Sequence, residues 1–428
     1  MNVTITPKKL AGAITPPPSK SQAHRLIIAA ALSDGFCHLS NVSLSEDIQA
    51  TLRCMRTLDA DASADGTVIR GADLVDGHED PAPTVMDCGE SGSTLRFLIP
   101  VALALKGKGS FTGHGRLMER PQEPYFELFR EKGIAWSLEE SVLTVEGRLT
   151  PGIYAIRGDV SSQFITGLLY ALPLLDGDSE IHLTTELESR GYVDMTLDAL
   201  ERFGVEVEYD GARTFRVKGN QIYRHQDLTI EGDWSNAAFW FAAAGMGCEL
   251  DIQGLNPLSC QGDMRIAAHY AALCGEELVR EAGETPAARE GRRTVELDMS
   301  QCPDLVPPVA ALAALTPGCD THLVNAARLR IKESDRLATV TDVLNALGAQ
   351  VEEYPDSLII HGRASLAGGV TVSGHNDHRI AMMAAIAAIR CEAPVTITGA
   401  ECVKKSYPNF WEEYARLGGA IRREEEAV

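Results

Sequence analysis

The sequence predicts an α/β protein made of six copies of one unit, grouped as two domains of three units each. Ala/Leu-rich runs recur at intervals of about seventy residues, and each follows a loop of Ser, Gly, Asp or Asn. A chain of 428 residues is too long for one ordinary core, so two domains fit it better than a single closed ring. The loops that mark the six runs contain Ser19, Ser91, Ser161, Ser235, Pro303 and Asn376.

Two series of helices keep this interval. Runs of the first series, such as residues 26–32 and 381–389, are apolar on every side, which predicts helices buried inside a layer. Helices of the second series are amphipathic and are expected to start near Ser45, Met118, Arg190, Gln261, Ser334 and Tyr407. In the clearest of these, Ser334 is the predicted N-cap and Gly348 follows the last turn, and the apolar face contains Leu337, Val340, Leu344 and Leu347.

Short β-like runs lie between the helices and usually close with Gly, as in TVIRG, FRVKG, LIIHG and VTITG. The repeated unit is therefore strand, helix, strand, helix and further strands. Pro16–Pro18 and the turn at residues 231–233 are the predicted linkers. They divide the chain into a domain of residues 18–230 and a second domain of residues 1–17 plus 231–428.

The composition excludes several classes of function. A net charge of -21 and a pI near 5.0 argue against a general nucleic-acid or membrane-surface binder. The sequence has no apolar run of about 18 to 20 residues, and its first residues lack the apolar core of a signal peptide, so a cytoplasmic location is expected. The ten cysteines show no Cys-x-x-Cys pair, so we expect buried, reduced thiols and no metal site.

Cations gather at the loops that enter the buried helices. Small residues there leave backbone N–H groups free at a helix start, where the helix dipole also favours an anion. A single Lys or Arg at such a place is usually a solvated side chain, but recurrence across the repeats predicts recognition of phosphate or carboxylate. The cations are Lys20, Arg25, Arg96, Arg120, Lys332, Arg336, Arg379 and Lys405.

Two further patterns allow alternatives. His375 and His378 have a spacing that could ligate a metal, but no third ligand is evident, so a turn that caps the next helix is favoured. Asp304 could present its carboxylate to a substrate hydroxyl, or cap the fifth buried helix. The cap is favoured from the local sequence.

Seven segments, in order along the chain, resemble the signature segments of the 5-enolpyruvylshikimate-3-phosphate synthase family. The resemblance runs from the first loop to the last helix, with compatible spacing. The segments are PPSKSQAHR (17–25), GESGSTLR (89–96), MERP (118–121), VSSQF (160–164), LRIKESDRL (329–337), NDHR (376–379) and KSYP (405–408).

The resemblance implies a fold and a reaction. The fold is a pair of inside-out α/β barrel-like domains, each of three repeated βαβαββ units, joined by two crossings that form a hinge, with the active site in the cleft between them. The reaction transfers the enolpyruvyl group of phosphoenolpyruvate to the 5-hydroxyl of shikimate 3-phosphate and releases phosphate. It needs no metal or organic cofactor, and the expected protein is a monomer that binds neither nucleic acid nor membrane.

The resemblance also implies the site residues. Those expected around phosphoenolpyruvate are Lys20, Gly92, Arg120, Gln163, Arg336, Arg379 and Lys405. Those expected around shikimate 3-phosphate are Ser21, Arg25, Ser161, Ser162, Gln163, Ser189, Tyr192, Asp304 and Lys332. Bidentate Arg contacts suit both carboxylate and phosphate.

The implied chemistry is acid–base catalysis without a protein nucleophile. Asp304 is expected to take the hydroxyl proton with Lys332 nearby, and Glu333 to move the proton at the methylene carbon. Lys20 and Lys405 complete the expected catalytic set, and Lys405 with the arginines stabilises the departing phosphate.

Two rival functions predict different features. A UDP-N-acetylglucosamine enolpyruvyl transferase is expected to begin its first motif with Lys-Asn and to use a cysteine in a loop. Here the start is Lys20-Ser21, and no Cys lies beside Glu119 to Pro121. An inactive binding protein of the same repeat fold is expected to show a basic face or to have lost several of the matched cations and carboxylates. All of those side chains are present.

Overall fold

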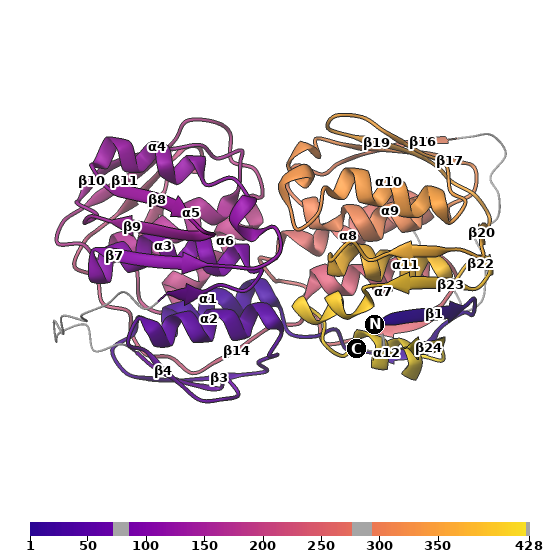
Figure 1. Cartoon of the computed structure of the whole chain (residues 1–428), viewed down its shortest axis with the longest axis horizontal. Coiled ribbons are helices and arrows are strands. Elements are labelled where there is room, and N and C mark those ends of the chain that lie inside the picture. Colours follow the sequence, from indigo (N-terminus) through magenta and orange to yellow (C-terminus); the bar gives the residue numbers. More distant parts are fainter. Residues whose placement is uncertain (72–84, 276–292, 425–428) are drawn as a thin grey trace. The chain divides into compact units, whose positions relative to one another are not determined.

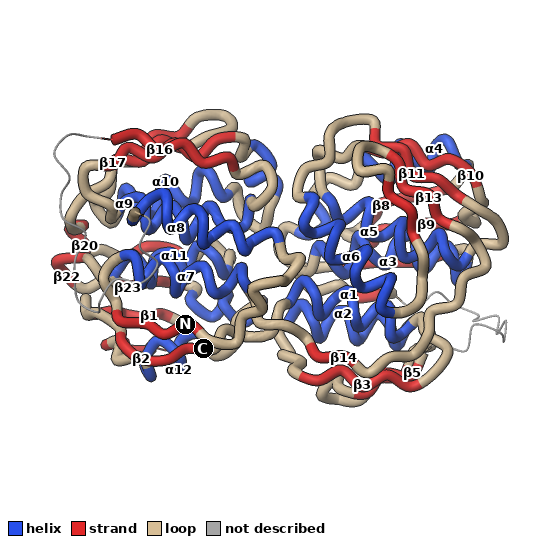
Figure 2. Tube along the Cα trace, turned by 180° about the vertical axis from the view of Figure 1, so that it is seen from behind, coloured by secondary structure: helices blue, strands red, loops and turns tan. Residues whose placement is uncertain are grey.

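A computed structural model of the chain describes residues 1–71, 85–275 and 293–424. The chain divides into two compact units. The first unit is Pro18–Glu231, and the second unit combines Met1–Pro17 with Gly232–Val428. Within each unit, helices fill the middle and strands lie nearer its outside (Figures 1 and 2).

The sheets of the first unit share one strand pattern. Among its described residues there are three four-stranded sheets, with the orders β14-β3-β5-β4, β6-β7-β9-β8 and β10-β11-β13-β12. The strands are β3 (Phe36–Ser40), β4 (Asp61–Ala62), β5 (Val68–Arg70), β6 (Met86–Asp87), β7 (Lys108–Thr112), β8 (Ala135–Glu139), β9 (Val142–Glu146), β10 (Gly152–Ile156), β11 (Ser179–Leu183), β12 (Val207–Tyr209), β13 (Thr214–Val217) and β14 (Leu228–Thr229).

In the sheet β10-β11-β13-β12 the first pair of strands is parallel and the other two pairs are antiparallel. A parallel pair needs a crossover connection, and helix α5 (Ser162–Ala171) supplies it between β10 and β11. The same combination of one parallel and two antiparallel pairs is found in the sheet β6-β7-β9-β8.

The second unit takes two strands from the start of the chain. Its strands are β1 (Asn2–Thr6), β2 (Ala11–Ile14), β15 (Glu249–Ile252), β16 (Arg293–Asp298), β17 (Cys319–Val324), β18 (Val351–Glu353), β19 (Leu358–His361), β20 (Leu366–Gly368), β21 (Thr371–Ser373), β22 (Cys391–Ala393), β23 (Val395–Thr398) and β24 (Ala420–Glu424). Strand β1 lies between β23 and β24, where Val3 is opposite both Ile397 and Arg423. The predicted strand runs are confirmed as β5, β13, β19 and β23.

The first-series helices are buried on all sides, as predicted. In α11, every residue from His378 to Ala388 is buried. Ser19, Ser91 and Ser161, which lie in the predicted loops, cap their helices, whereas Asp233 and Asp377 are the caps of α7 and α11. The helices are α1 (Lys20–Ala31), α3 (Gly92–Lys106), α5, α7 (Trp234–Gly245), α9 (Val306–Ala314) and α11 (His378–Ala388).

The second-series helices also occur, with local differences in their starts. They are α2 (Glu46–Thr57), α4 (Glu123–Lys132), α6 (Arg190–Arg202), α8 (Ile266–Cys274), α10 (Arg336–Ala346) and α12 (Phe410–Arg416). The predicted apolar face of α10 is buried. Its predicted N-cap was wrong, because Asp335 accepts the cap bond from the amide of Ala338, while the Ser334 hydroxyl donates to Asp377 at 2.9 Å. A buried carboxylate is the stronger acceptor for that hydroxyl.

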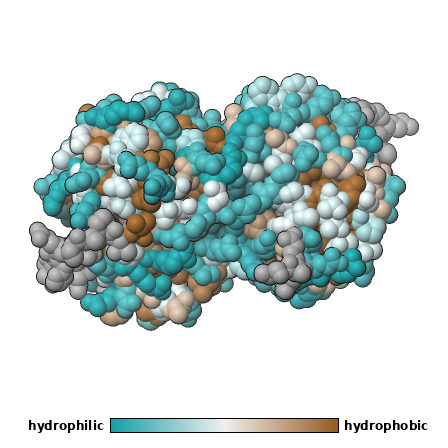
Figure 3. All heavy atoms as spheres, viewed as in Figure 1, coloured by the Kyte–Doolittle hydropathy of each residue, from teal (hydrophilic) through white to brown (hydrophobic). Residues whose placement is uncertain are grey.

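The surface and the cysteines agree with the composition. Hydrophilic residues cover much of the face in Figure 3. All ten cysteines are free thiols, and most are buried. Over the ranges that the structure describes, no helix has both the length and the apolar character needed to span a bilayer.

Helices α3 and α5 pack closely at Gly167, which yields a test of the packing. A Cβ at Gly167 would overlap the Tyr125 hydroxyl and the carbonyl oxygen of Arg96. We expect Gly167→Ala to lower the free energy of unfolding by about 1–3 kcal/mol, because one helix must shift. Urea denaturation measures this loss.

The Tyr125→Phe background provides the control. If the hydroxyl contributes to the overlap, Gly167→Ala must cost less in that background than in the wild type. Equal unfolding midpoints for the wild type and Gly167→Ala would contradict the close packing.

Candidate active site

Arg336 is the centre of an ion-pair cluster in the second unit. It is the first residue of α10 and its side chain is 1% exposed. Its Nε and Nη2 donate to Asp377 at 2.8 and 3.1 Å, its Nη1 donates to Asp304 at 2.9 Å, and its Nη2 donates to Glu333 at 2.8 Å. Asp377 is wholly buried and also accepts from the amide of Arg379 at 3.0 Å, because it caps α11.

The carboxylate of Asp304 forms ion pairs with three of the predicted cations. Besides Arg336, the Lys332 Nζ lies 3.4 Å from its carboxylate and the Arg379 Nη2 lies 3.2 Å away. The favoured interpretation of Asp304 as a helix cap was wrong. Asp304 belongs to the 3₁₀ turn Pro303–Leu305, and α9 begins after Leu305 without a side-chain cap. Its carboxylate turns to the cations because each of those charge pairs is stronger than a bond to one amide.

The cluster changes the acidity of its two central cations in opposite directions. Burial lowers the pKa of Lys332, and the charge of Asp304 opposes this only in part. Burial acts on Arg336 in the same sense, but the carboxylates of Asp377, Glu333 and Asp304 outweigh it and raise the pKa of that guanidinium. Arg336 therefore stays charged, while Lys332 gives up a proton more readily than an exposed lysine.

Lys405 lies beside the loop before α11. It ends the 3₁₀ turn Ala400–Lys405, is buried, and donates to the carbonyl oxygen of Asn376 at 2.6 Å. His375 contacts Asp342 at 3.2 Å, whereas His378 is buried in α11. The favoured turn-and-cap interpretation of this loop is confirmed by Asp377. Within the described ranges, no group of three or more His, Cys, Asp or Glu is arranged to hold a metal ion.

In the first unit, Arg25 is anchored on α1. It is 2% exposed, and its Nε donates to the Thr196 hydroxyl at 2.9 Å. Its Nη1 and Nη2 donate to the carbonyl oxygens of Ser21 and Tyr192, both at 2.7 Å. Lys20 at the start of the same helix pairs with Asp47 at 2.6 Å. The structure therefore groups Lys20, Ser21, Arg25 and Tyr192.

A second group in the first unit surrounds the start of α3. Arg96 donates to the Gln163 side chain at 2.9 Å, and Gln163 donates to the Ser93 hydroxyl at 3.0 Å. The Arg120 guanidinium lies so close to Gly92 that a Cβ there would be 2.6 Å from its Nη1. A larger residue at position 92 would therefore displace the Arg120 guanidinium.

The serines predicted for the phosphate group occupy helix starts. Ser161 caps α5 and Ser162 is its first residue. Ser189 precedes α6 with a left-handed φ of 55° and is buried. These serines therefore lie beside the backbone N–H groups of two helix starts.

A buried hydrogen-bond chain links α1, α2 and α3. His24 Nδ1 lies 2.7 Å from the Thr51 hydroxyl, which lies 2.7 Å from the Thr94 hydroxyl, and Thr94 donates to Ser91 at 2.8 Å. Burial, and then the charges of Lys20 and Arg25, hold the pKa of His24 well below its usual range. Neutral His24 thus lies at one end of a hydrogen-bond chain whose other end is the cap of α3.

Sequence reasoning missed several acids of these clusters. Asp47 pairs with Lys20, Asp377 with Arg336, and Asp263 accepts from the Ser235 hydroxyl. A usable signal existed, since each follows a loop that enters a helix or a 3₁₀ turn, where acids are favoured. Their partners, however, lie 27, 41 and 28 residues away along the chain.

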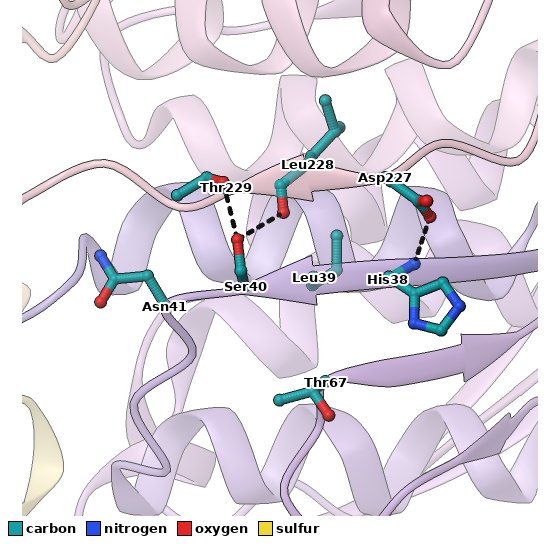
Figure 4. Close-up of a pocket in the computed structure, with 8 residues that line it drawn as sticks. All are labelled: His38, Leu39, Ser40, Asn41, Thr67, Asp227, Leu228 and Thr229. Atoms are coloured by element: carbon teal, nitrogen blue, oxygen red, sulfur yellow. Dashed lines mark hydrogen bonds between the residues drawn. The ribbon is translucent and has the colours of Figure 1, made fainter.

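A separate pocket of about 490 Å³ lies on the first unit (Figure 4). Its walls come from β3, β14 and the residue before β5, and none of the predicted site residues is among them. The Ser40 hydroxyl contacts that of Thr229 at 2.6 Å, and Asp227 accepts from the amide of His38 at 2.9 Å. Its polar groups thus bond across the β3–β14 pair.

The two sets of clusters have complementary chemistry. In the first unit, Arg25 and Arg96 donate to carbonyl oxygens and neutral side chains, whereas Lys20 pairs with Asp47. In the second unit, Lys332, Arg336 and Arg379 pair with carboxylates, which brings cations together with groups that can exchange protons.

Comparison with known proteins identifies the family. The model of the family described as EPSP synthase (3-phosphoshikimate 1-carboxyvinyltransferase) matches residues 5–414. Proteins named 3-phosphoshikimate 1-carboxyvinyltransferase from Clostridium kluyveri and from Clostridium perfringens strain SM101 are 47% and 46% identical. Each alignment covers 98% or 99% of both chains.

Solved structures agree. An EPSP synthase from Acinetobacter baumannii is 27% identical with a TM-score of 0.77, covering 99% of this chain and 100% of that one. The enolpyruvyl transferase NikO from Streptomyces tendae, at 19% identity and a TM-score of 0.76 over 98% of both chains, shares the fold. With a family model spanning nearly the whole chain and relatives this similar over their full length, the chain belongs to the EPSP synthase family.

Proposed function

We propose that this protein transfers the enolpyruvyl group of phosphoenolpyruvate to the 5-hydroxyl of shikimate 3-phosphate, giving 5-enolpyruvylshikimate 3-phosphate and phosphate. The observation that carries the proposal is the cluster around Arg336. It combines buried cations that suit an anionic donor with carboxylates that suit proton transfer, in a chain of the EPSP synthase family.

In the proposed mechanism, Asp304 takes the proton of the 5-hydroxyl as that oxygen attacks the central carbon of phosphoenolpyruvate. Glu333 transfers protons at the methylene carbon, which gains a proton in the addition and loses one in the elimination. The carbon–oxygen bond to phosphate then breaks, and Lys405, Lys20 and the arginines stabilise the departing phosphate.

Anion binding would release the catalytic acids. Arg336 and Arg379 are paired with Asp304, and Arg336 also with Glu333. When the carboxylate and phosphate of the donor take over these guanidinium groups, Asp304 and Glu333 become available for the proton transfers. Lys332, with its lowered pKa, is placed to help Asp304.

The remaining predicted residues are assigned by role. Gly92, Arg120 and Gln163 hold phosphoenolpyruvate with Lys20, Arg336, Arg379 and Lys405. Ser21, Arg25, Ser161, Ser162, Ser189 and Tyr192 hold shikimate 3-phosphate, with Gln163, Asp304 and Lys332. Their support is the grouping of these side chains at helix starts within each unit.

The finer architecture belongs to the same proposal. We take each unit as an inside-out barrel-like domain of three repeats, supported by the buried first-series helices and the recurring sheet pattern. A shared cleft and a hinge at the two crossings stay predictions. So do a cytoplasmic location, a monomeric state, the absence of nucleic-acid partners and activity without a metal or organic cofactor, which rest on the composition and the family resemblance.

The test is phosphate release by the purified protein. Phosphoenolpyruvate with shikimate 3-phosphate should give release, and either compound alone should not. Release with UDP-N-acetylglucosamine as acceptor would instead support the rival transferase. A folded protein that releases phosphate with neither pair would support the inactive binding protein.

Asp304→Asn tests the proposed base. We expect kcat to fall by about 10²–10⁴-fold, because the amide cannot take the hydroxyl proton. Steady-state phosphate release measures it. Asp320→Asn is the matched control, since Asp320 pairs with His361 in the same unit and should keep normal turnover. Near-normal kcat in Asp304→Asn would remove Asp304 from the mechanism.

Glu333→Gln tests proton movement at the methylene carbon. In heavy water, we expect the variant to incorporate deuterium into that carbon at least about tenfold more slowly than the wild type. Mass spectrometry of recovered phosphoenolpyruvate and product measures this rate. Glu353→Gln is the control, because Glu353 pairs with Arg330. Unchanged incorporation in Glu333→Gln would assign the proton to another group.

A further inference from the structure

Asp263 is a buried acid that the proposed mechanism does not use. It lies in the 3₁₀ turn Gly262–Arg265 and is 4% exposed. The neighbouring Gln261 fixes this turn to the start of α7, because its side chain accepts from the amide of Trp234 at 3.1 Å and donates to the carbonyl oxygen of Gly232 at 2.9 Å. Asp263 is therefore held in one place.

A hydrogen-bond chain connects Asp263 to Asp304. The Ser235 hydroxyl donates to Asp263 and accepts from Arg379 Nη2 at 3.0 Å. The same Nη2 donates to Asp304 Oδ2 at 3.2 Å, and Nη1 donates to the Asp304 carbonyl oxygen at 3.3 Å. Ser235 has a single proton and gives it to Asp263, so its oxygen is oriented to receive Arg379. The guanidinium is thus shared between two carboxylates.

The charged groups around Asp263 come from every packed element. Asp304 and Arg379 face it from the turn before α9 and from α11, Asp233 from the start of α7, and Cys302 and Arg265 lie close by. Burial, followed by repulsion from Asp304, raises the pKa of Asp263 to about 6, against the opposing effects of Arg379 and Ser235. Asp263 is therefore charged at neutral pH and becomes neutral in mild acid.

We propose that Asp263 is a positioning residue for the reaction: through Ser235 it holds Arg379 and draws part of that charge away from Asp304, which keeps Asp304 basic enough to accept the hydroxyl proton. This inference rests on the proposed role of Asp304. A cation shared with a second carboxylate stabilises the ionised form of the first one less. Without the charge on Asp263, Arg379 acts more strongly on Asp304 and makes it a weaker base.

Asp263→Asn tests the inference, because an amide keeps an acceptor for Ser235 while the charge is lost. Well above pH 6, we expect kcat to fall about three- to tenfold, because a carboxylate whose charge is held more tightly accepts the hydroxyl proton less readily. The KM for phosphoenolpyruvate should stay the same or fall, since Arg379 loses a competing carboxylate.

The pH dependence distinguishes this role from a structural one. The wild-type Asp263 itself loses its charge below about pH 6, so the turnover numbers of the wild type and the variant should converge below about pH 5. A loss that is the same at all pH values, an unchanged kcat at all pH values, or a raised KM with normal kcat would each overturn the proposal.

The melting temperature of Asp263→Asn checks whether the variant folds, and the direction of its change from the wild type can be predicted. A carboxyl group whose pKa is raised in the folded state costs stability as pH rises through that pKa. We therefore expect Asp263→Asn to melt higher than the wild type above about pH 6, with the difference shrinking in acid.

If Asp263→Asn fails to fold, variants of Ser235 test the same inference. Ser235→Ala keeps the carboxylate but removes the bridge, and should lower kcat without raising the KM for phosphoenolpyruvate. Ser235→Thr keeps the hydroxyl and should restore turnover. Normal kcat in Ser235→Ala would overturn the proposal, and Asp320→Asn again serves as the unaffected control.

The wild-type assay separates the two failures. If the wild type releases no phosphate from phosphoenolpyruvate and shikimate 3-phosphate, the proposed function fails and this inference fails with it. If the wild type is active and Asp263→Asn follows it at every pH, only the role of Asp263 is rejected.

Discussion

The burial of the Arg336 charge is the constraint on which the second unit depends. A guanidinium that is 1% exposed must be met by acceptors, and Asp377, Asp304 and Glu333 meet it. This requirement draws together the start of α10, the turn before α9 and the start of α11. It also explains why Asp304 does not cap a helix. The same pairs that satisfy the buried charge hold the proposed acid and base in reach of one another, so the stability of these loops and their chemistry share one set of contacts.

The two units treat their cations differently. Arg25 and Arg96 in the first unit bond to carbonyl oxygens and neutral side chains. Arg336 and Arg379 in the second unit are matched by carboxylates. A site that only holds a phosphate benefits from fixed positive charge, whereas a site that moves protons needs acids and cations side by side. The proposed division between acceptor binding and proton transfer follows this difference.

Features governed by local sequence were predicted well. The buried helices that follow the loops of Ser19, Ser91 and Ser161 and the apolar face of α10 depend on neighbours a few residues away, and the structure has them. Predictions failed where distant segments decide. Asp335 caps α10 in place of Ser334, because the Ser334 hydroxyl bonds to Asp377, 43 residues away. No role was predicted for Asp263, because its link to the cluster passes through Ser235 and Arg379, which are 144 residues apart. The family resemblance supplied catalytic roles that spacing alone did not.

The position of β1 has a consequence for how the chain acquires its structure during synthesis. The first unit is one continuous stretch, so all its strands are available once residue 231 has left the ribosome. Residues 2–6 are made long before their partners, β23 and β24. Val3 and Ile5, both fully buried in the finished sheet, must wait with their backbone groups unpaired until those strands have been made. The second unit is therefore the one whose completion depends on a late, long-range closure, and the one in which a stalled chain leaves an exposed strand.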